Sequence, residues 1–331
     1  MDKSSLLGKQ NFRNIAITGA SGFIGQKLIN DLSNSDDVRI HLLIHRNSDF
    51  NPSIKSKVVT VEGDLMMSET LQGLLKPGCT VVNLVYLASK SRDDNLMAIN
   101  NLADACTTAK IKRLIHCSTA VSVGNVRDDK ITEETKCYPR SDYEVVKFEI
   151  EKLLWEKAYN QFELTILRPT AVFGPGGQNL LKLANDLRKG NKFINYMKSC
   201  LYNRRKMNLV CIDNVVSSII FLIETNRRID GEVFFISDDE SPINNYREIE
   251  KYVIKRFGFK DYSFPRVPLP NFLLVALLTL AGKSNLNPNR VYSCEKLMKA
   301  GFKKSISFEM GIDSFADWYE KKFLYVGLSE N

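Results

Sequence analysis

A tyrosine and a lysine four residues apart are the first residues in this sequence whose spacing suggests chemistry. Tyr143 and Lys147 fall in a segment of strong helical character, residues 140–159, and residues at positions i and i+4 share one face of a helix. An ammonium group beside a phenol stabilises the phenolate and lowers a pKa that begins near about 10. Such a tyrosine can exchange a proton near neutral pH.

A glycine-rich turn near the start of the chain predicts a phosphate site. The apolar run 14–18 leads directly into residues 18–25, TGASGFIG, and then into an amphipathic segment. Glycine permits a tight turn and lets main-chain N–H groups approach a pyrophosphate at the positive end of the next helix. Its place between the first strand and the first helix favours a dinucleotide over a plain turn. The expected contacts are Gly19, Ser21, Gly22, Phe23, Ile24 and Gly25.

The elements that must position these residues alternate through the first half of the chain. The predicted strands are residues 14–18, 38–44, 58–61, 80–85, 113–117 and 164–167. The predicted helices are residues 22–33, 68–75, 94–109 and 140–159. This alternation predicts an α/β fold, a doubly wound and mostly parallel Rossmann sheet covered by helices on both faces. The rest of the chain, 171–331, is interrupted by glycines and prolines and predicts a smaller, mainly helical lobe.

Three motifs together resemble the extended short-chain dehydrogenase/reductase family and, within it, the NAD-dependent epimerase/dehydratase group. They are the GxxGxxG spacing of residues 19–25, the YxxxK of residues 143–147, and RPTAVFGPG at residues 168–176, which is similar to the family's RPxxVYGPG. Residues 118–124, STAVSVG, look like the family's SSxxxxG segment. The resemblance implies that Thr119 polarises the reacting oxygen, with Ser118 as the alternative. Tyr143 and Lys147 complete the implied catalytic set.

The same resemblance implies further contacts to cofactor and substrate. Beside Tyr143 and Lys147, the implied cofactor residues are Asp64, Leu65, Leu87, Ala88, Asn95, Pro169 and Val172. The implied substrate residues are Ser118, Thr119, Asn179, Arg204 and Arg205. The planar fork of arginine suits the diphosphate of a nucleotide-linked sugar. Which of Arg204 and Arg205 faces that diphosphate is left open.

The end of the second predicted strand bears on the choice of dinucleotide. Residues 43–47 read LIHRN and contain no acid that could bond the ribose hydroxyls of NAD. Arg46 can instead neutralise a 2′-phosphate. We therefore expect NADP(H) rather than NAD(H), with a solvated loop residue as the alternative for Arg46.

Composition restricts the partners and the compartment. The chain has 331 residues, a net charge of +8, 44% hydrophobic and 25% charged residues, which is ordinary for a globular protein. Its seven cysteines are scattered without CxxC spacing, and its three histidines all lie within the first 116 residues. These patterns predict reduced thiols in the cytoplasm and no metal site. The basic clusters are short and lack interleaved aromatic residues, so no nucleic-acid partner is expected.

One apolar run raises the question of a membrane. Residues 272–281, FLLVALLTLA, fall short of the roughly 20 residues that a spanning helix needs. We expect a buried helix here rather than an interfacial anchor, and contact with a membrane is left open. Residues 1–12 contain no apolar segment long enough for a signal sequence, so secretion is not supported.

Together these features predict an NADPH-dependent reductase of a nucleotide-linked sugar. The sequence most resembles bacterial O-antigen reductases that convert UDP-4-keto-6-deoxy-N-acetylhexosamine to UDP-N-acetylquinovosamine, which implies a role in lipopolysaccharide or other surface polysaccharide synthesis. An NAD-dependent 4-epimerase uses the same residues and stays open, as does a non-catalytic NADP-binding sensor or scaffold. Residues 1–170 are expected to bind the dinucleotide and 171–331 mainly the substrate. A homodimer is left open.

Overall fold

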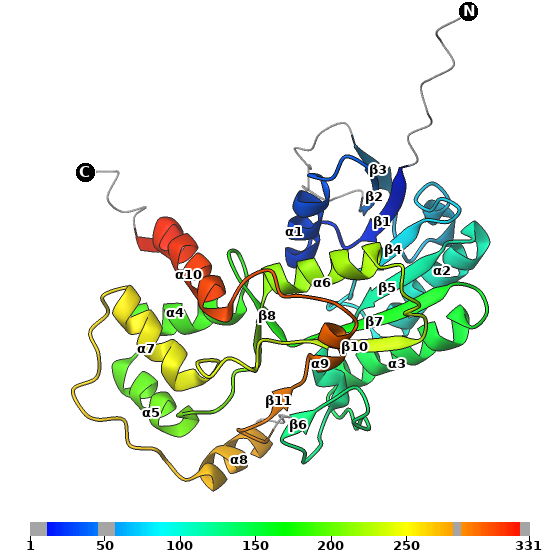
Figure 1. Ribbon diagram of the computed structural model, residues 1–331. Helices are drawn as coiled ribbons and strands as arrows, with labels where there is room; N and C mark the ends of the chain where they lie inside the picture. The colour runs from blue at the N-terminus through cyan, green and yellow to red at the C-terminus, as the bar shows by residue number, and fades with distance from the viewer. Residues whose placement is uncertain (1–11, 46–56, 281–285, 325–331) are drawn as a thin grey trace, which may run out of the picture. The chain divides into compact units, whose positions relative to one another are not determined.

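The main sheet has seven strands in the order β10-β7-β5-β4-β1-β2-β3 (Figure 1). The structure, a computed structural model, describes residues 12–45, 57–280 and 286–324. The strands are β1 Arg13–Thr18, β2 Val38–Ile44, β3 Val58–Glu62, β4 Thr80–Asn83, β5 Arg113–Cys117, β7 Glu163–Pro169 and β10 Glu232–Ile236. The pairs β1–β2, β2–β3, β1–β4 and β4–β5 are parallel. The mostly parallel sheet that the sequence predicts is confirmed.

Two helices position the strand ends of the first half. Helix α1, Phe23–Leu32, joins β1 to β2, and helix α2, Arg92–Ala109, joins β4 to β5. The sheet grows in opposite directions from β1 in these two steps. Because crossovers between parallel strands are right-handed, the two helices cover opposite faces. The reversal between β1 and β4 is where doubly wound sheets bind ligands, beyond the carboxyl ends of the strands.

The helix predicted over residues 68–75 is wrong. The structure has only a 3₁₀ turn, η2, at Ser68–Leu71. The hydroxyl of Thr70 donates to the carbonyl oxygens of Asp64 and Met67, at 3.0 and 2.7 Å, which ties this turn to the end of β3. Gly73 follows two residues after the turn, and glycine in a helix interior is unfavourable by roughly 1 kcal/mol. The segment therefore ends before a second turn forms.

Two compact units, each drawn from three stretches of chain, make up the molecule. The first unit comprises Met1–Cys117, Ile150–Ile166 and Ile223–Glu232. The second unit comprises Ser118–Glu149, Leu167–Leu222 and Val233–Asn331. Helix α3, Asp142–Ala158, therefore begins in the second unit and ends in the first. The expected division at residue 170 concerns which part binds which ligand, and it stays a prediction.

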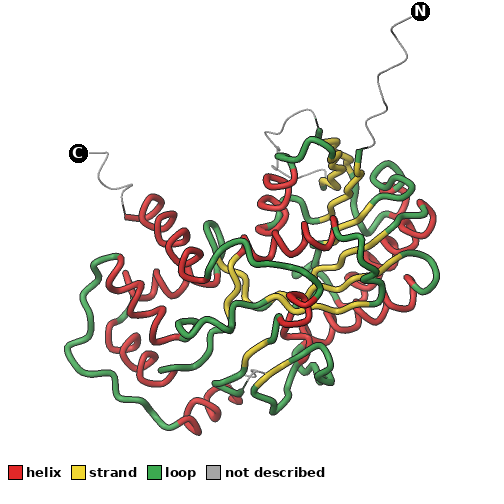
Figure 2. Tube along the Cα trace, in the orientation of Figure 1, coloured by secondary structure: helices red, strands yellow, loops and turns green. Residues whose placement is uncertain are grey.

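The described part of the second unit is mainly helical, and besides parts of β7 and β10 it has two short pairs of strands. Figure 2 shows the helices in red and the strands in yellow. Strand β8, Ala171–Phe173, pairs with β9, Leu209–Cys211, and β6, Lys130–Ile131, pairs with β11, Val291–Tyr292. The remaining elements are η3 Ala120–Val123, α4 Asn179–Lys189, α5 Lys192–Tyr202, α6 Ile212–Glu224, α7 Tyr246–Arg256, α8 Asn271–Leu280, α9 Glu295–Lys299, α10 Phe308–Tyr319 and the π-helical turn η4 Glu320–Leu324.

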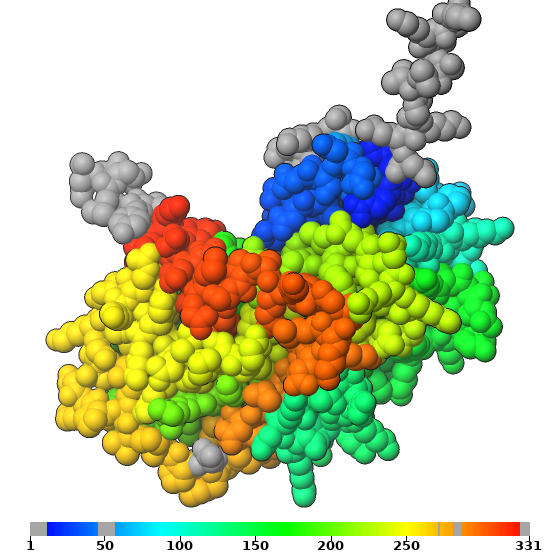
Figure 3. Space-filling model, viewed as in Figure 1, coloured from blue at the N-terminus to red at the C-terminus, as the bar shows by residue number. Residues whose placement is uncertain are grey.

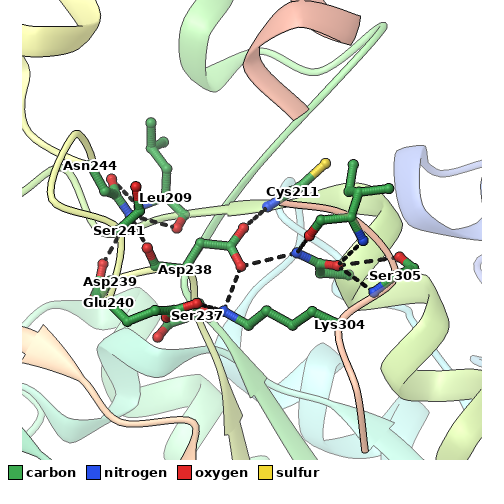
Figure 4. Close-up of polar contacts among 12 residues, drawn as sticks. Leu209, Cys211, Ser237, Asp238, Asp239, Glu240, Ser241, Asn244, Lys304 and Ser305 are labelled. Atoms are coloured by element: carbon green, nitrogen blue, oxygen red, sulfur yellow. Dashed lines mark hydrogen bonds and ion pairs between the residues drawn. The ribbon is translucent and has the colours of Figure 1, made fainter. Parts of the chain in front are cut away.

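A buried carboxylate after β10 joins distant parts of the second unit (Figure 4). Asp238 accepts hydrogen bonds from Nζ of Lys304 at 2.7 Å, from the backbone N–H of Cys211 at 2.8 Å and from Nδ2 of Asn214 at 3.0 Å. Its side chain is almost fully buried. Burial raises the pKa of Asp238, while Lys304 acts in the opposite direction. One side chain thus fixes the ends of β9 and β10, the start of α6 and the segment before α10.

The neighbouring carboxylate binds a second set of segments. Asp239 accepts hydrogen bonds from the backbone N–H of Tyr292 and from Nδ2 of Asn208, both at 2.8 Å. Nδ2 of Asn244 donates to its other oxygen at 3.2 Å. Burial raises the pKa of Asp239 to about 6. Asp239 therefore links strand β11 to the residues that lead into β9.

Helix α8 is not the buried helix that the sequence predicts. Five apolar side chains are exposed, and they are Phe272, Leu273, Ala276, Leu277 and Leu280. Only Leu274 and Leu278 are buried on the opposite face. Ala281, the last residue of the predicted run, lies outside the described residues. Within the ranges that the structure describes, no helix has the length and apolar character needed to cross a bilayer.

Candidate active site

The glycine turn is shaped by contacts that a side chain would obstruct. Gly19 has φ of +80°, and a Cβ there would lie 3.1 Å from the backbone carbon of Leu84. A Cβ on Gly25 would lie 2.2 Å from the carbonyl oxygen of Gly19. Gly22, which precedes α1, has no side chain to cap the helix, and the first turn of α1 carries no acid. The first N–H groups of α1 are therefore open to an anion from solvent.

A pocket of about 330 Å³ opens over this turn. Six of the predicted cofactor residues line it, and they are Gly19, Ser21, Gly22, Asp64, Leu65 and Leu87. His45, at the end of β2, lines the same pocket, and its Nε2 lies 3.5 Å from Oδ2 of Asp64. The pocket lies at the carboxyl ends of β1, β2 and β4 and, with its glycine cradle, fits a dinucleotide. Arg46, which carries the choice of NADP(H), lies outside the described residues.

Other predicted cofactor residues, among them Phe23, Ile24 and Asn95, do not line the pocket. Phe23 and Ile24 form the first turn of α1. Asn95 is buried, accepts from the N–H of Leu87 at 2.9 Å and donates to the carbonyl oxygen of the same residue at 3.0 Å. These bonds hold the backbone of Leu87 against the pocket. Ala88, which follows, is not among the lining residues.

A buried chain of polar side chains under the pocket was missed from the sequence. Oγ1 of Thr18 donates to Oδ1 of Asn83 at 2.7 Å, and Nδ2 of Asn83 lies 3.0 Å from Nδ1 of His116. Oδ1 of Asn83 also accepts from the N–H of Val85 at 3.1 Å. Thr18 and Asn83 end β1 and β4, and His116 is the last residue but one of β5; the three strands are neighbours in the sheet. Polar residues at the ends of apolar strands were the signal that could have found them.

The segment after β5 carries the predicted hydroxyls. Thr119 caps η3, and its Oγ1 accepts from the N–H of Val121 at 3.4 Å. Ser118 is buried, and its Oγ has no hydrogen-bond partner within the described residues. Gly124, which ends the motif, has φ of +73°, and a Cβ there would lie 2.0 Å from the carbonyl oxygen of Tyr138. A residue with a side chain could not replace Gly124, because the backbone of Tyr138 passes too close to it.

An arginine that the sequence did not single out fixes the same segment. Arg290 is buried, and its Nη1 donates to the carbonyl oxygen of Gly124 at 3.1 Å. Its Nη2 donates to the carbonyl oxygen of Val126. Arg290 lies 166 positions from Gly124, so no local sequence pattern predicts this contact.

Helix α3 presents the tyrosine and the lysine in different environments. Tyr143 is 40% exposed, whereas Lys147, one turn later on the same face, is 4% exposed. A capping box starts the helix, because Oε2 of Glu144 accepts from the N–H of Ser141 at 3.2 Å and Oγ of Ser141 accepts from the N–H of Glu144 at 3.4 Å. This SxxE pattern was readable in the sequence. Thr119, Tyr143 and Lys147 all belong to the second unit.

The end of β7 and the strand that follows carry two further predicted cofactor residues, Pro169 and Val172. Pro169 is buried at the end of β7, and Val172 lies in β8. Nδ2 of Asn179 donates to the carbonyl oxygen of Val172 at 2.6 Å. Asn179 therefore has a structural role in joining α4 to β8, beside any contact with a ligand.

The two candidate arginines differ in their surroundings. Arg204 is exposed, whereas Arg205 is half-buried. Burial lowers the pKa of Arg205, and the positive charge of Arg290 adds to that effect. The backbone of Arg205 is fixed on both sides, since its N–H donates to Tyr202 at 2.8 Å and its carbonyl oxygen accepts from Tyr246 at 3.0 Å. The backbone of Arg205 is thus held in place, with its side chain half-buried.

The model of the NAD dependent epimerase/dehydratase family matches residues 15–237, which is more than half of the chain. The chain belongs to this family. The match to this epimerase/dehydratase model includes the glycine turn, the YxxxK pair and the segment after β7. The family resemblance expected from the sequence is confirmed.

Three similar proteins each share a quarter or less of their aligned residues with this chain. Sterol-4-alpha-carboxylate 3-dehydrogenase ERG26 of Candida albicans is 24% identical, over 93% of this chain and 98% of that protein. N-acetyl-alpha-D-glucosaminyl-diphospho-ditrans,octacis-undecaprenol 4-epimerase of Escherichia coli O157:H7 is 25% identical, over 91% and 93%. The Bordetella bronchiseptica enzyme WbmG, solved with NAD and UDP, matches with a TM-score of 0.73 at 20% identity, over 94% and 96%. This last likeness shows the fold.

Proposed function

We propose that the protein reduces a nucleotide-linked 4-keto-6-deoxy sugar with NADPH, and that the substrate is UDP-4-keto-6-deoxy-N-acetylhexosamine. The pair on α3, a buried Lys147 one helical turn from an exposed Tyr143, carries the oxidoreductase part of this proposal. Residues 43–47, which contain Arg46 and no acid, carry the choice of NADPH. A phenol that faces solvent can reach a substrate oxygen, and a lysine beneath it can stabilise the phenolate that remains. The family to which the chain belongs supports an oxidoreductase of this kind.

Each residue then has one task in the reduction. The dinucleotide, when bound, supplies the hydride that reduces the keto carbon. Tyr143 donates the proton to the oxygen of that carbon, so that a ketone becomes an alcohol. Lys147 stabilises the tyrosinate and holds the ribose, while Thr119 donates a hydrogen bond to the reacting oxygen, with Ser118 as the alternative. Gly19–Gly25, Asp64 and Leu87 hold the dinucleotide.

Arg205 is the better of the two arginine candidates for the diphosphate of the substrate. Its side chain is half-buried, so that less water screens the charge of its guanidinium. Arg204 is exposed, and a solvated arginine contributes less to an ion pair. The UDP bound by the WbmG enzyme supports a UDP-linked substrate for this chain as well.

An NAD-dependent 4-epimerase is the second candidate. The E. coli relative is named as a 4-epimerase of a diphosphate-linked N-acetylglucosamine, and WbmG is solved with NAD. Epimerisation needs the same tyrosine, lysine and hydroxyl, since it oxidises and then reduces one carbon. The two candidates differ in the dinucleotide, because only a reductase consumes it.

A substrate panel separates these candidates. Purified protein is incubated with UDP-, GDP- and dTDP-linked 4-keto-6-deoxy sugars and NADPH or NADH, and dinucleotide oxidation is followed at its absorbance band. The proposal predicts stoichiometric oxidation of NADPH with the UDP-linked sugar. Tyr143→Phe should lower this rate by about 10²- to 10⁴-fold while dinucleotide affinity is kept. Conversion of UDP-N-acetylglucosamine without net oxidation would instead establish the epimerase.

A further inference from the structure

Helix α8 leaves an apolar face in contact with solvent. Phe272 and Leu280 are 68% and 91% exposed, and Leu273 and Leu277 lie between them. With Ala276, these residues repeat at the spacing of a single face of an α-helix. Burial of large apolar side chains is the main favourable term in association, so a face of this kind indicates a binding surface.

The neighbouring helix extends the apolar character. Helices α5 and α8 contact each other, and the N–H of Leu269, just before α8, donates to the carbonyl oxygen of Cys200 at 3.1 Å. Phe193, Ile194 and Met197 of α5 are also exposed. In Figure 3 the amber atoms of α8 form part of the molecular surface.

The exposed side of α8 offers almost no polar group to a partner. Among residues 272–280 the polar residue is Thr279, which donates its hydroxyl to the carbonyl oxygen of Val275 at 2.8 Å. Protein interfaces surround an apolar centre with polar groups that hydrogen-bond across the contact. A hydrocarbon layer requires no such bonds.

Positive charge is concentrated on α4 and α5, and α5 is the helix that contacts α8. Residues 182–206, which contain most of α4 and all of α5, include eight lysines and arginines, and Asp186 is their one acidic residue. The chain as a whole has a net charge of +8. Lys189 and Lys192, on either side of the α4–α5 turn, are exposed. Basic residues next to an apolar helix face favour an anionic lipid surface.

We propose that α8 and the start of α5 dock the protein on the surface of an anionic phospholipid bilayer. The apolar face of α8 enters the boundary between headgroups and acyl chains, and the lysines of the α4–α5 turn contact the headgroups. A helix of ten residues is too short to span the bilayer and lies along it. This inference is independent of the reaction proposed above.

Vesicle flotation tests the docking directly. Full-length protein is mixed with vesicles of phosphatidylcholine alone or with about a third phosphatidylglycerol, at about 50 and about 500 mM NaCl. We expect at least tenfold more bound protein on the anionic vesicles at low salt. Leu277→Glu with Leu280→Glu should lower binding by about tenfold or more, since two charges would enter the apolar boundary. Lys189→Glu with Lys192→Glu should remove the preference for anionic vesicles.

Matched controls keep the proposal open to refutation. Met298→Glu with Met310→Glu introduces the same two charges at exposed apolar positions of α9 and α10, and its binding should equal that of the wild type. All variants should keep the thermal midpoint of the wild type, because the substituted side chains are exposed. Failure of the wild type to bind anionic vesicles would overturn the proposal. So would unchanged binding by the α8 variant, or light scattering that shows a dimer which this variant splits, since a second copy would then cover the face.

Discussion

The pocket of the first unit and the network of the second unit differ in the groups that build them. The pocket is formed by backbone at the ends of neighbouring strands, with glycines where a Cβ would collide. The network is centred on two buried carboxylates, Asp238 and Asp239. Asp238 by itself accepts hydrogen bonds from Cys211, Asn214 and Lys304. Backbone geometry is encoded locally, whereas a buried charge depends on partners far along the chain. The two units should therefore respond differently to substitution.

The largest expected effect is on the second unit. Asp238→Asn removes the charge that faces Lys304 while the shape is kept, and breaking a buried pair costs about 3 kcal/mol or more. Urea unfolding measures the loss. Glu240→Gln is the control, since Glu240 contacts the same lysine from an exposed position, where a pair contributes under about 1 kcal/mol. Equal losses for both variants would break the comparison.

The pH dependence of stability provides the second test of the network. The pKa of Asp239 rises from 3.8 to about 6 in the folded protein, so the folded state holds the proton more tightly than the unfolded chain. The stabilisation that protonated Asp239 provides is complete below about pH 4 and is lost as the pH rises through about 6. Relative to Asp239→Asn, the wild type should lose up to about 3 kcal/mol between pH 4 and pH 7. Urea unfolding at several pH values measures it, and parallel pH profiles would contradict the assignment.

In the first unit the backbone forms most of the pocket, and Arg46 would be an exception, because its side chain would decide between NADPH and NADH. If its guanidinium meets the 2′-phosphate, Arg46→Ala should weaken NADPH binding by ten- to a hundredfold, or about 1.5–3 kcal/mol, and leave NADH nearly unchanged. Fluorescence titration with both dinucleotides measures this. Arg39→Ala, at an exposed position of β2, serves as the control. Equal affinity of the wild type for NADH and NADPH would remove the main support for a reductase.

The smallest expected effect tests whether the backbone of the glycine turn requires glycine at residue 25. Gly25→Ala places a Cβ against the carbonyl oxygen of Gly19, and overpacking of this kind costs about 1–3 kcal/mol. The shift should also reduce dinucleotide affinity, because the turn must open. Gly73→Ala is the matched control in the same unit, since its Cβ would meet Val61 at an ordinary 3.6 Å. Thermal unfolding and titration of both variants would show whether the turn tolerates a methyl group.

The same difference between local and long-range contacts decides which parts of the structure the sequence could predict. Strands β1, β2, β3 and β5 begin and end within one residue of their predicted bounds, because apolar runs and turns are local signals. Short strands β8, β9 and β11 were not predicted, since pairing across the second unit creates them. The glycine turn lies between β1 and α1, where the sequence places it, and Gly19, Ser21 and Gly22 line a pocket there; their contact with a dinucleotide stays a prediction. The hydrogen bond from Arg290 to Gly124 was not predicted, because two residues 166 positions apart form no periodic pattern in the sequence.

The exposed face of α8 shows a different limit. An apolar run of this length predicts a helix but not its surroundings, because the sequence does not say which neighbours cover each side. In the structure Leu274 and Leu278 are buried while Leu277 and Leu280 face solvent. Periodicity could not separate these sides, since both are apolar.

The interleaving of the two units bears on how the chain is made. The first unit ends with residues 223–232, so it lacks its last stretch until more than two thirds of the chain has left the ribosome. Strands β1 to β5 must meanwhile persist as a nascent sheet whose later neighbours are still being translated. At about 5–20 residues per second, the delay between residues 117 and 232 lasts several seconds or longer. During that interval the growing edge of the sheet is a natural target for chaperones.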